Sequence, residues 1–249
     1  MYKIDAADEA QLFATIDRWV EREVAPRVKE FDHADKWPAE LVGQMKEFGL
    51  FGATVSPDYG GLGLPATTYA EIVMKISSVW MAITGIFNSH LMLALAVEKF
   101  GTEPQKRRWL PKLASGEIRG GLALTEPDAG TDLQAIRMTA RREGDHYVVN
   151  GSKMFITSGM RADYYTVAVR TGGPGASGVS LLLIERDREG FGRTKLKKMG
   201  WWASDTAQLF FDNVRVPVDN LIGVENKGFI GIMLNFNQER LGMAAAACG

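Results

Sequence analysis

The sequence predicts an α+β protein built from several domains. We expect an all-α N-terminal domain over residues 1–118 and an antiparallel β-barrel or sandwich over residues 119–226. Residues 227–249 are expected to form the first helix of a C-terminal helical bundle. Three successive sequence patterns support this prediction: apolar residues at three- and four-residue spacing, then short β-branched runs between turn residues, then an alanine-rich helical run. The 249 residues, 46% of them hydrophobic, suffice for more than one core.

The helical part begins with an amphipathic stripe from Ala7 to Phe31. Pro38 suits the first turn of a short helix, which Gly49 should end. A breaker-rich loop, SPDYGGLGLP, comes next. Two more helical runs follow, and Thr102 is a fitting N-cap for a last helix that starts near Pro104. These two runs are Ala66 to Ser77 and Ala82 to Phe100.

The β part consists of short runs with no helical run between them, which favours a barrel or sandwich over a parallel sheet. The predicted strands are Gly121 to Leu124, His146 to Val149, Lys153 to Ile156, Tyr164 to Val169, Val179 to Ile184 and Ala207 to Phe211. Asn150-Gly151 lies between two of them and predicts a hairpin turn. The segment TGGPGASG predicts a surface loop.

The last run, after Asn226-Lys227-Gly228, has apolar residues on helical spacing and the strongly helix-forming stretch Ala244 to Ala247. A helix with an apolar face usually continues into partner helices. We therefore expect a C-terminal helical domain of which this chain holds only the beginning.

Composition excludes several classes of function. The net charge is −1, from 29 basic and 30 acidic residues. Such a balance creates no positive electrostatic field that would attract nucleic acid or an anionic membrane. One cysteine, Cys248, allows no disulfide within the chain and fits a reducing compartment. The three histidines lack metal-ligand spacing, so we expect no metal site. They are His33, His90 and His146.

The most apolar stretch, Val79 to Val97, is interrupted by Asn88-Ser89-His90. It predicts a buried helix rather than a membrane span. The N-terminus carries acidic residues early and has no apolar core, unlike a signal peptide. We therefore expect a cytoplasmic protein.

Three segments offer side chains suited to chemistry. In the first, a strand ends in the turn TEPDAGTD, whose backbone N–H groups could bond a cofactor edge, although a plain capped turn explains it equally well. In the second, Phe155 and Thr157 are two apart and should share one face of a strand. Phe155 could stack on a planar ring while Thr157 bonds its edge; a core aromatic beside a surface threonine is the alternative.

The third segment is Asn237-Gln-Glu-Arg-Leu241 in the last helix. Glu239 stands among apolar residues, which could raise the pKa of its carboxyl towards neutrality and suit a general base. Arg240 lies about 100° around the helix and should face another direction, where it could anchor a phosphate or carboxylate. An ordinary solvated Glu-Arg pair is the alternative interpretation.

Four strings taken in order resemble the acyl-CoA dehydrogenase family. They are TEPDAGTD, NGSKMFITSG, KMGWWASDTAQLFFDNVRVPVDNLIG and GFIGIMLNFNQERLGMAAAACG. SPDYGGLGLP and FGTEPQKRRWLPKLASGE are similar to family segments at matching distances. The resemblance extends from about residue 7 to the end.

The resemblance implies an FAD-dependent oxidoreductase of fatty acid metabolism that desaturates acyl-CoA thioesters at the α and β carbons. A carboxylate would take the α proton, and flavin N5 would take the β hydride. An electron-transfer flavoprotein would accept the electrons, and the full-length protein would be a homotetramer or homodimer. The acyl pocket would lie between the helix containing Leu91 to Val97 and the final helix.

The resemblance also implies roles for individual residues. Residues at flavin-contacting positions are Leu122, Leu124, Thr125, Gly130, Thr131, Phe155, Ile156 and Thr157. Thr131, Asn237 and Arg240 match positions that contact the acyl-CoA substrate. Glu239 matches the base of the isovaleryl-CoA and long-chain branches, which lies in a Glu-Arg-Leu triplet; other branches draw their base from the C-terminal domain.

Two rival functions remain open from the sequence. An acyl-CoA oxidase or a flavin monooxygenase of the same superfamily would share these motifs. The chain could also be an inactive fragment or an interaction module, because the family's C-terminal helices complete the FAD site.

Overall fold

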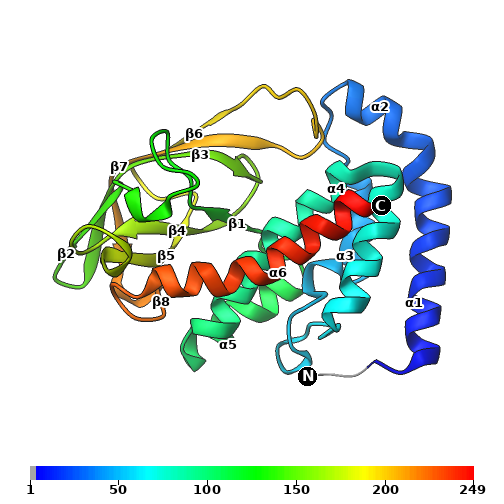
Figure 1. Ribbon diagram of the computed structural model, residues 1–249, viewed down its shortest axis with the longest axis horizontal. Helices are drawn as coiled ribbons and strands as arrows, with labels where there is room; N and C mark the ends of the chain where they lie inside the picture. The colour runs from blue at the N-terminus through cyan, green and yellow to red at the C-terminus, as the bar shows by residue number, and fades with distance from the viewer. Residues whose placement is uncertain (1–3) are drawn as a thin grey trace.

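A computed structural model describes residues 4–249 of the chain (Figure 1). Its first helix, α1 (Ala6–Trp19), is capped by the Asp5 carboxylate, which accepts a hydrogen bond from the Ala7 N–H. The helical path then continues through π-helical and 3-10 turns into a short further helix. These segments are η1 (Val20–Val24), η2 (Ala25–Arg27) and α2 (Val28–His33). The predicted stripe is thus helical throughout but not one regular α-helix, since Pro26 has no N–H to donate inside it.

The next helices agree with the boundaries that the sequence predicted. Helix α3 (Ala39–Glu47) starts directly after Pro38, and Gly49 ends its last turn with φ 72°. Two 3-10 turns, η3 (Leu50–Gly52) and η4 (Pro57–Tyr59), lead to α4 (Ala66–Phe100). Thr102 forms a capping box with Gln105 at the start of α5 (Glu103–Ala114), as expected from its position.

Helix α4 is two helical runs joined at a kink. Trp80 has non-helical dihedrals, φ −152° and ψ 89°, between the two runs that the sequence predicted. Among the described residues, α4 is the one helix long and apolar enough to cross a membrane, and 78% of that apolar window is buried inside the protein. The apolar length is therefore accounted for by the core that α4 forms with its neighbours.

The β part of the described chain is one eight-stranded, mostly antiparallel sheet, in which seven strands follow the order β6-β7-β3-β2-β4-β5-β8 and β1 lies off this path beside β4. The first strand, β1, pairs in parallel with β4, and β2 meets β4 in parallel at one position. The predicted fold class is confirmed, with these parallel contacts as an addition. The strands are β1 (Gly120–Ala123), β2 (Thr139–Glu143), β3 (His146–Thr157), β4 (Tyr164–Arg170), β5 (Val179–Glu185), β6 (Phe191–Lys195), β7 (Thr206–Pro217) and β8 (Leu221–Ile222).

The hairpin predicted at Asn150-Gly151 is wrong. The dipeptide lies inside β3, which pairs with β7 on both sides of it, and the pairing shifts register there. The Asn150 side chain accepts a hydrogen bond from the Asn213 N–H at 2.8 Å, while Asn213 has φ 54° in the neighbouring strand. Asn150-Gly151 thus supports a β-bulge between two long strands, which requires the same residue types as a turn.

The last helix, α6 (Gly228–Cys248), lies along α4 and ends at the C-terminus (Figure 1). It starts two residues after Asn226, whose backbone is in the left-handed region with φ 65°. One apolar core joins the helices to one face of the sheet, and a second core lies within the sheet. The candidate site lies where α4, α6 and the sheet meet.

Candidate active site

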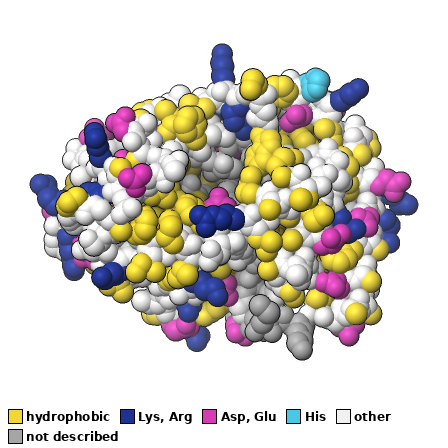
Figure 2. Space-filling model, in the orientation of Figure 1, with side chains coloured by type: hydrophobic (Ala, Val, Ile, Leu, Met, Phe, Trp, Pro, Cys, Tyr) yellow, Lys and Arg dark blue, Asp and Glu magenta, His cyan; other side chains and the backbone are white. Residues whose placement is uncertain are grey.

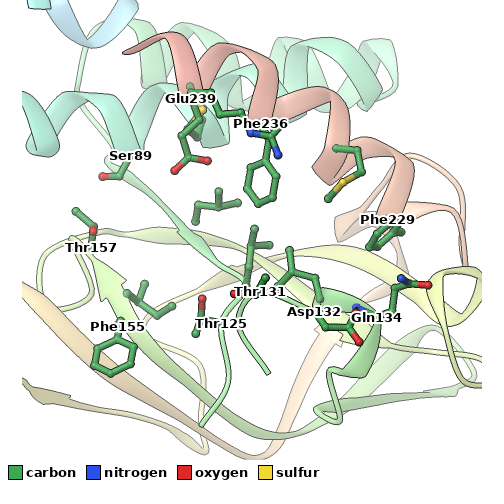
Figure 3. A pocket seen from close by; sticks show the side chains of 18 residues that line it. Ser89, Thr125, Thr131, Asp132, Gln134, Phe155, Thr157, Phe229, Phe236 and Glu239 are labelled. Atoms are coloured by element: carbon green, nitrogen blue, oxygen red, sulfur yellow. The ribbon is translucent and has the colours of Figure 1, made fainter. Parts of the chain in front are cut away.

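A cavity of about 450 Å³ opens between α6, the middle of α4 and the sheet. Figure 2 shows its mouth as a hollow near the centre of one face, with a basic and an acidic side chain together at its rim. The lining residues come from segments far apart in the sequence (Figure 3). They are Ser89, Met92, Leu122, Leu124, Thr125, Gly130, Thr131, Asp132, Leu133, Gln134, Phe155, Ile156, Thr157, Phe229, Met233, Phe236, Glu239 and Arg240.

The cavity brings together nearly all the residues that the sequence singled out. All eight residues at expected cofactor positions line it, as do Glu239 and Arg240. Asn237 does not belong to the lining and is exposed on α6. From the stretch Leu91 to Val97, expected to bound an acyl pocket, Met92 alone of the described residues reaches the cavity. Leu95 lines a separate cavity, and the remaining residues of the stretch are buried.

Glu239 projects from α6 towards the centre of the cavity (Figure 3). Its Oε2 atom is buried and has no hydrogen-bond partner among the described residues. Burial disfavours the charged carboxylate and raises the pKa of Glu239, while the Arg240 guanidinium opposes this shift. The apolar shielding inferred from the sequence is therefore present.

Arg240 lies at the mouth of the same cavity instead of facing a different direction. Its guanidinium carbon sits 5.4 Å from the centre of the Phe236 ring, one turn earlier on α6. The long arginine side chain bends back over this ring. The direction expected for Arg240 from its angle around the helix did not allow for this bend. Arg240 is exposed and so remains able to meet an anionic ligand.

Phe155 occupies a β-bulge and not a regular strand position. The pairing of β3 with β7 shifts register between Lys153 and Ile156, and Phe155 has φ 60°. The residue is 67% exposed. The expected common face with Thr157 does not follow from strand alternation here, because the extra residue breaks the period of two. Both side chains line the cavity all the same.

The turn TEPDAGTD is joined to this bulge by a direct backbone contact. The Met154 N–H donates to the Thr125 carbonyl at 2.8 Å. Beneath the contact, Lys153 Nζ lies 2.9 Å from Glu126 Oε1 in a buried ion pair. Sequence reasoning passed over Glu126 and Lys153. The available signal was two opposite charges placed inside the two motifs proposed to share one site.

A second group, outside the predicted site residues, fixes the far end of β3. Ser89 on α4 lies 3.1 Å from Ser158, oxygen to oxygen. The Asp205 carboxylate accepts a hydrogen bond from the Met160 N–H at 2.7 Å, and the Asp205 carbonyl accepts from the Ser158 N–H at 2.9 Å. These contacts hold the end of the strand carrying Thr157 against α4.

Asn235, one turn before Glu239, ties α6 to α4. Its Nδ2 donates to the Met92 carbonyl at 3.0 Å, and the residue is buried. Because residues four apart share a helix face, this contact also sets the direction in which Glu239 points. An asparagine four residues before a candidate base was the signal in the sequence.

The cavity combines a shielded carboxylate with apolar walls and hydroxyl groups. This combination is typical of an enzyme active site and not of simple packing between helices. Family comparison then identifies the chain. It matches the acyl-CoA dehydrogenase N-terminal domain over residues 6–117 and the middle domain of the same family over residues 121–214. The chain belongs to the acyl-CoA dehydrogenase family.

Individual relatives agree with this assignment. The short-chain specific acyl-CoA dehydrogenase of Clostridium acetobutylicum is 40% identical over 237 residues, which are 94% of this chain and 62% of the relative. A mitochondrial isovaleryl-CoA dehydrogenase of Pongo abelii is 33% identical, over 97% of this chain and 59% of the relative. Butyryl-CoA dehydrogenase of Megasphaera elsdenii superimposes with a TM-score of 0.93 at 33% identity, covering 99% of this chain and 66% of that structure. The chain thus spans about three fifths of the length of these curated relatives.

Proposed function

We propose that this chain carries the flavin-facing and substrate-facing parts of an FAD-dependent acyl-CoA dehydrogenase, which desaturates acyl-CoA thioesters at the α and β carbons. The observation that carries the proposal is the position of Glu239. Its shielded carboxylate faces the same cavity as both expected flavin motifs. The enzyme names of the relatives support the reaction class.

The cavity residues fit the ring end of a flavin. Leu122 and Leu124 offer apolar contact, and the hydroxyls of Thr125 and Thr157 offer bonds to a polar ring edge. Phe155 is exposed at the cavity and free to stack against a planar ring. Bound FAD supplies the acceptor for the hydride that leaves the β carbon. The 450 Å³ cavity is of a size for one ring system and a thioester.

Glu239 is proposed as the base that takes the α proton. A raised pKa makes its carboxylate a stronger base than a solvated glutamate, and its unpartnered Oε2 leaves a lone pair free for the proton. Thr131 is proposed beside the pantetheine of the substrate. Arg240 at the mouth, with Asn237 on the exposed face of α6, is proposed to meet the CoA end.

Further proposals follow the family. We assign residues 1–118, 119–226 and 227–249 to the helical, β and C-terminal domains. We expect an electron-transfer flavoprotein as electron acceptor, a homodimer or homotetramer as the assembly, and the cytoplasm as the location. The acyl-CoA oxidase and interaction-module alternatives are outcomes of the test below.

The test compares the chain with its Glu239→Gln variant after loading with FAD. Anaerobic butyryl-CoA should bleach the flavin of the parent, and Glu239→Gln should keep FAD but bleach at least about 100-fold more slowly. Glu189→Gln, an exposed carboxylate outside the cavity, is the matched control and should behave as the parent.

Each alternative predicts a different result. Unchanged bleaching in Glu239→Gln would place the base elsewhere. A parent protein that takes up no FAD would favour the interaction module. Rapid reoxidation of the bleached flavin by air, faster than by an electron-transfer flavoprotein, would favour the oxidase.

A further inference from the structure

The buried ion pair of Glu126 and Lys153 has a geometry that stability alone does not explain. Lys153 is fully buried and Glu126 is 7% exposed. Lys153 Nζ donates to Glu126 Oε1 at 2.9 Å and to the Leu124 carbonyl at 2.8 Å. Burial lowers the pKa of Lys153 to about 8, and the Glu126 charge opposes this shift. Taking two charges out of water is costly, and apolar side chains of similar size often serve a core equally well.

The carboxylate of Glu126 is also the centre of a backbone network. Its Oε2 accepts from the Arg137 N–H at 2.6 Å, and its Oε1 accepts from the Met138 N–H at 3.0 Å. The Glu126 N–H and carbonyl both bond Ala129, at 2.8 and 3.3 Å, which closes the turn. The side chain therefore fixes both the beginning of the TEPDAGTD turn and the chain that returns from it.

The lysine half of the pair stands at the start of the bulge. Lys153 directly precedes Met154, whose N–H bonds the Thr125 carbonyl, and Phe155, whose φ is 60°. Its ammonium holds the carbonyl of Leu124, a residue of the cavity wall. One charged pair thus links the turn and the bulge, both of which present side chains to the cavity but come from different strands.

We propose that Glu126 and Lys153 are positioning residues that hold the turn of residues 125–131 and the bulge at Met154-Phe155 in one fixed relation, so that both flavin-facing segments meet the ring together. This inference rests on the proposed function for the identity of the ligand. The fixed relation itself is a property of the chain without ligand and can be tested separately.

The test uses Lys153→Met, which keeps the length of the side chain, and Glu126→Gln, which keeps a carbonyl acceptor. Amide hydrogen exchange on the flavin-free protein reports the backbone. We expect the Met154 amide to exchange about tenfold faster or more in both variants, since a charge-assisted buried bond is lost. The amides of Tyr147 and Val148 in the same strand should exchange at the parent rate.

A second measurement is FAD titration by fluorescence quenching. It should show dissociation constants for FAD raised by about tenfold or more in both variants.

The matched control is Lys112→Met, which removes an exposed lysine from its 3.2 Å pair with Glu117. It should leave Met154 exchange and FAD affinity unchanged. Parent-like Met154 exchange in both variants would overturn the inference. Faster exchange spread evenly over the whole sheet would also overturn it, because it would mark the pair as a general stabiliser. A parent that binds no FAD would contradict the proposed function and leave the exchange result to decide the inference.

Discussion

The Nδ1 atom of His90 accepts a hydrogen bond from the Gly120 N–H at 2.9 Å, which ties helix α4 to the first strand of the sheet. The other ring nitrogen, Nε2, lies 3.1 Å from the Phe51 carbonyl and 3.0 Å from the Leu113 carbonyl. Carbonyls only accept, so Nε2 carries the hydrogen and the ring is neutral. Complete burial lowers the pKa of His90 to about 3, which agrees with this neutral form.

His90→Leu should destabilise the protein by about 2–4 kcal/mol, because three buried backbone groups lose their partner. Urea unfolding followed by far-UV circular dichroism measures this change. His33→Leu, at an exposed histidine of α2, is the control and should lie within about 0.5 kcal/mol of the parent. A loss below about 1 kcal/mol for His90→Leu would show that water replaces the imidazole.

The same imidazole predicts a pH dependence of stability. In the unfolded chain a histidine has a pKa of about 6.5, whereas folded His90 titrates at about 3. The unfolded state binds a proton in this interval that the folded state does not. The stabilisation is therefore complete above pH 6.5 and declines towards pH 3, by about 1.4 kcal/mol per pH unit. From pH 7 through 6 to 5, the urea midpoint of unfolding should fall more steeply for the parent than for His90→Gln, whose side chain does not titrate. An equal fall in both proteins would contradict the neutral, buried state of His90.

Much of the fold was predictable because its signals are local. Thr102 caps α5 and Gly49 ends α3 as expected, since each acts on backbone groups within four residues of itself. The Asn150-Gly151 error arose at a long-range feature. A bulge and a hairpin turn both need a residue free to take unusual dihedrals, and only the presence of the partner strand β7 decides between them.

The same difference between local and long-range signals holds for the candidate site. The motifs pointed to Leu122, Leu124, Thr125, Gly130, Thr131 and the run Phe155 to Thr157, and all of these residues line the cavity. The contacts that hold these motifs together were not found. The ion pair of Glu126 and Lys153 and the bond between Asn235 and Met92 join residues 27 and 143 positions apart, and no sequence period encodes such distances.

Two glycines of α6 should respond in opposite ways to alanine. At Gly231 a Cβ would make ordinary 3.4 Å contacts with Leu181 and Phe100, so Gly231→Ala should raise stability by about 1 kcal/mol through helix propensity. At Gly228 a Cβ would come within 2.8 Å of the Ser180 carbonyl carbon, a backbone atom that cannot rotate away. Gly228→Ala should therefore lower stability, by about 1–3 kcal/mol. Thermal unfolding of both variants measures the contrast, and a gain at Gly228 would show that α6 shifts freely on β5.

Phe155→Gly should separate the stability of the protein from its flavin affinity. A phenylalanine at φ 60° is strained by about 1 kcal/mol, and Phe155 is 67% exposed, so it contributes little to the core. Glycine relieves the strain but gains entropy in the unfolded chain, so the urea midpoint should change by less than about 1 kcal/mol. FAD affinity should nevertheless fall by about tenfold, because the stacking ring is gone. Phe191→Gly is the contrasting variant and should unfold far more easily, because it removes a ring whose centre lies 5.1 Å from the centre of the Phe211 ring. Unchanged FAD affinity in Phe155→Gly would mean that the strained backbone of the bulge serves something other than the flavin ring.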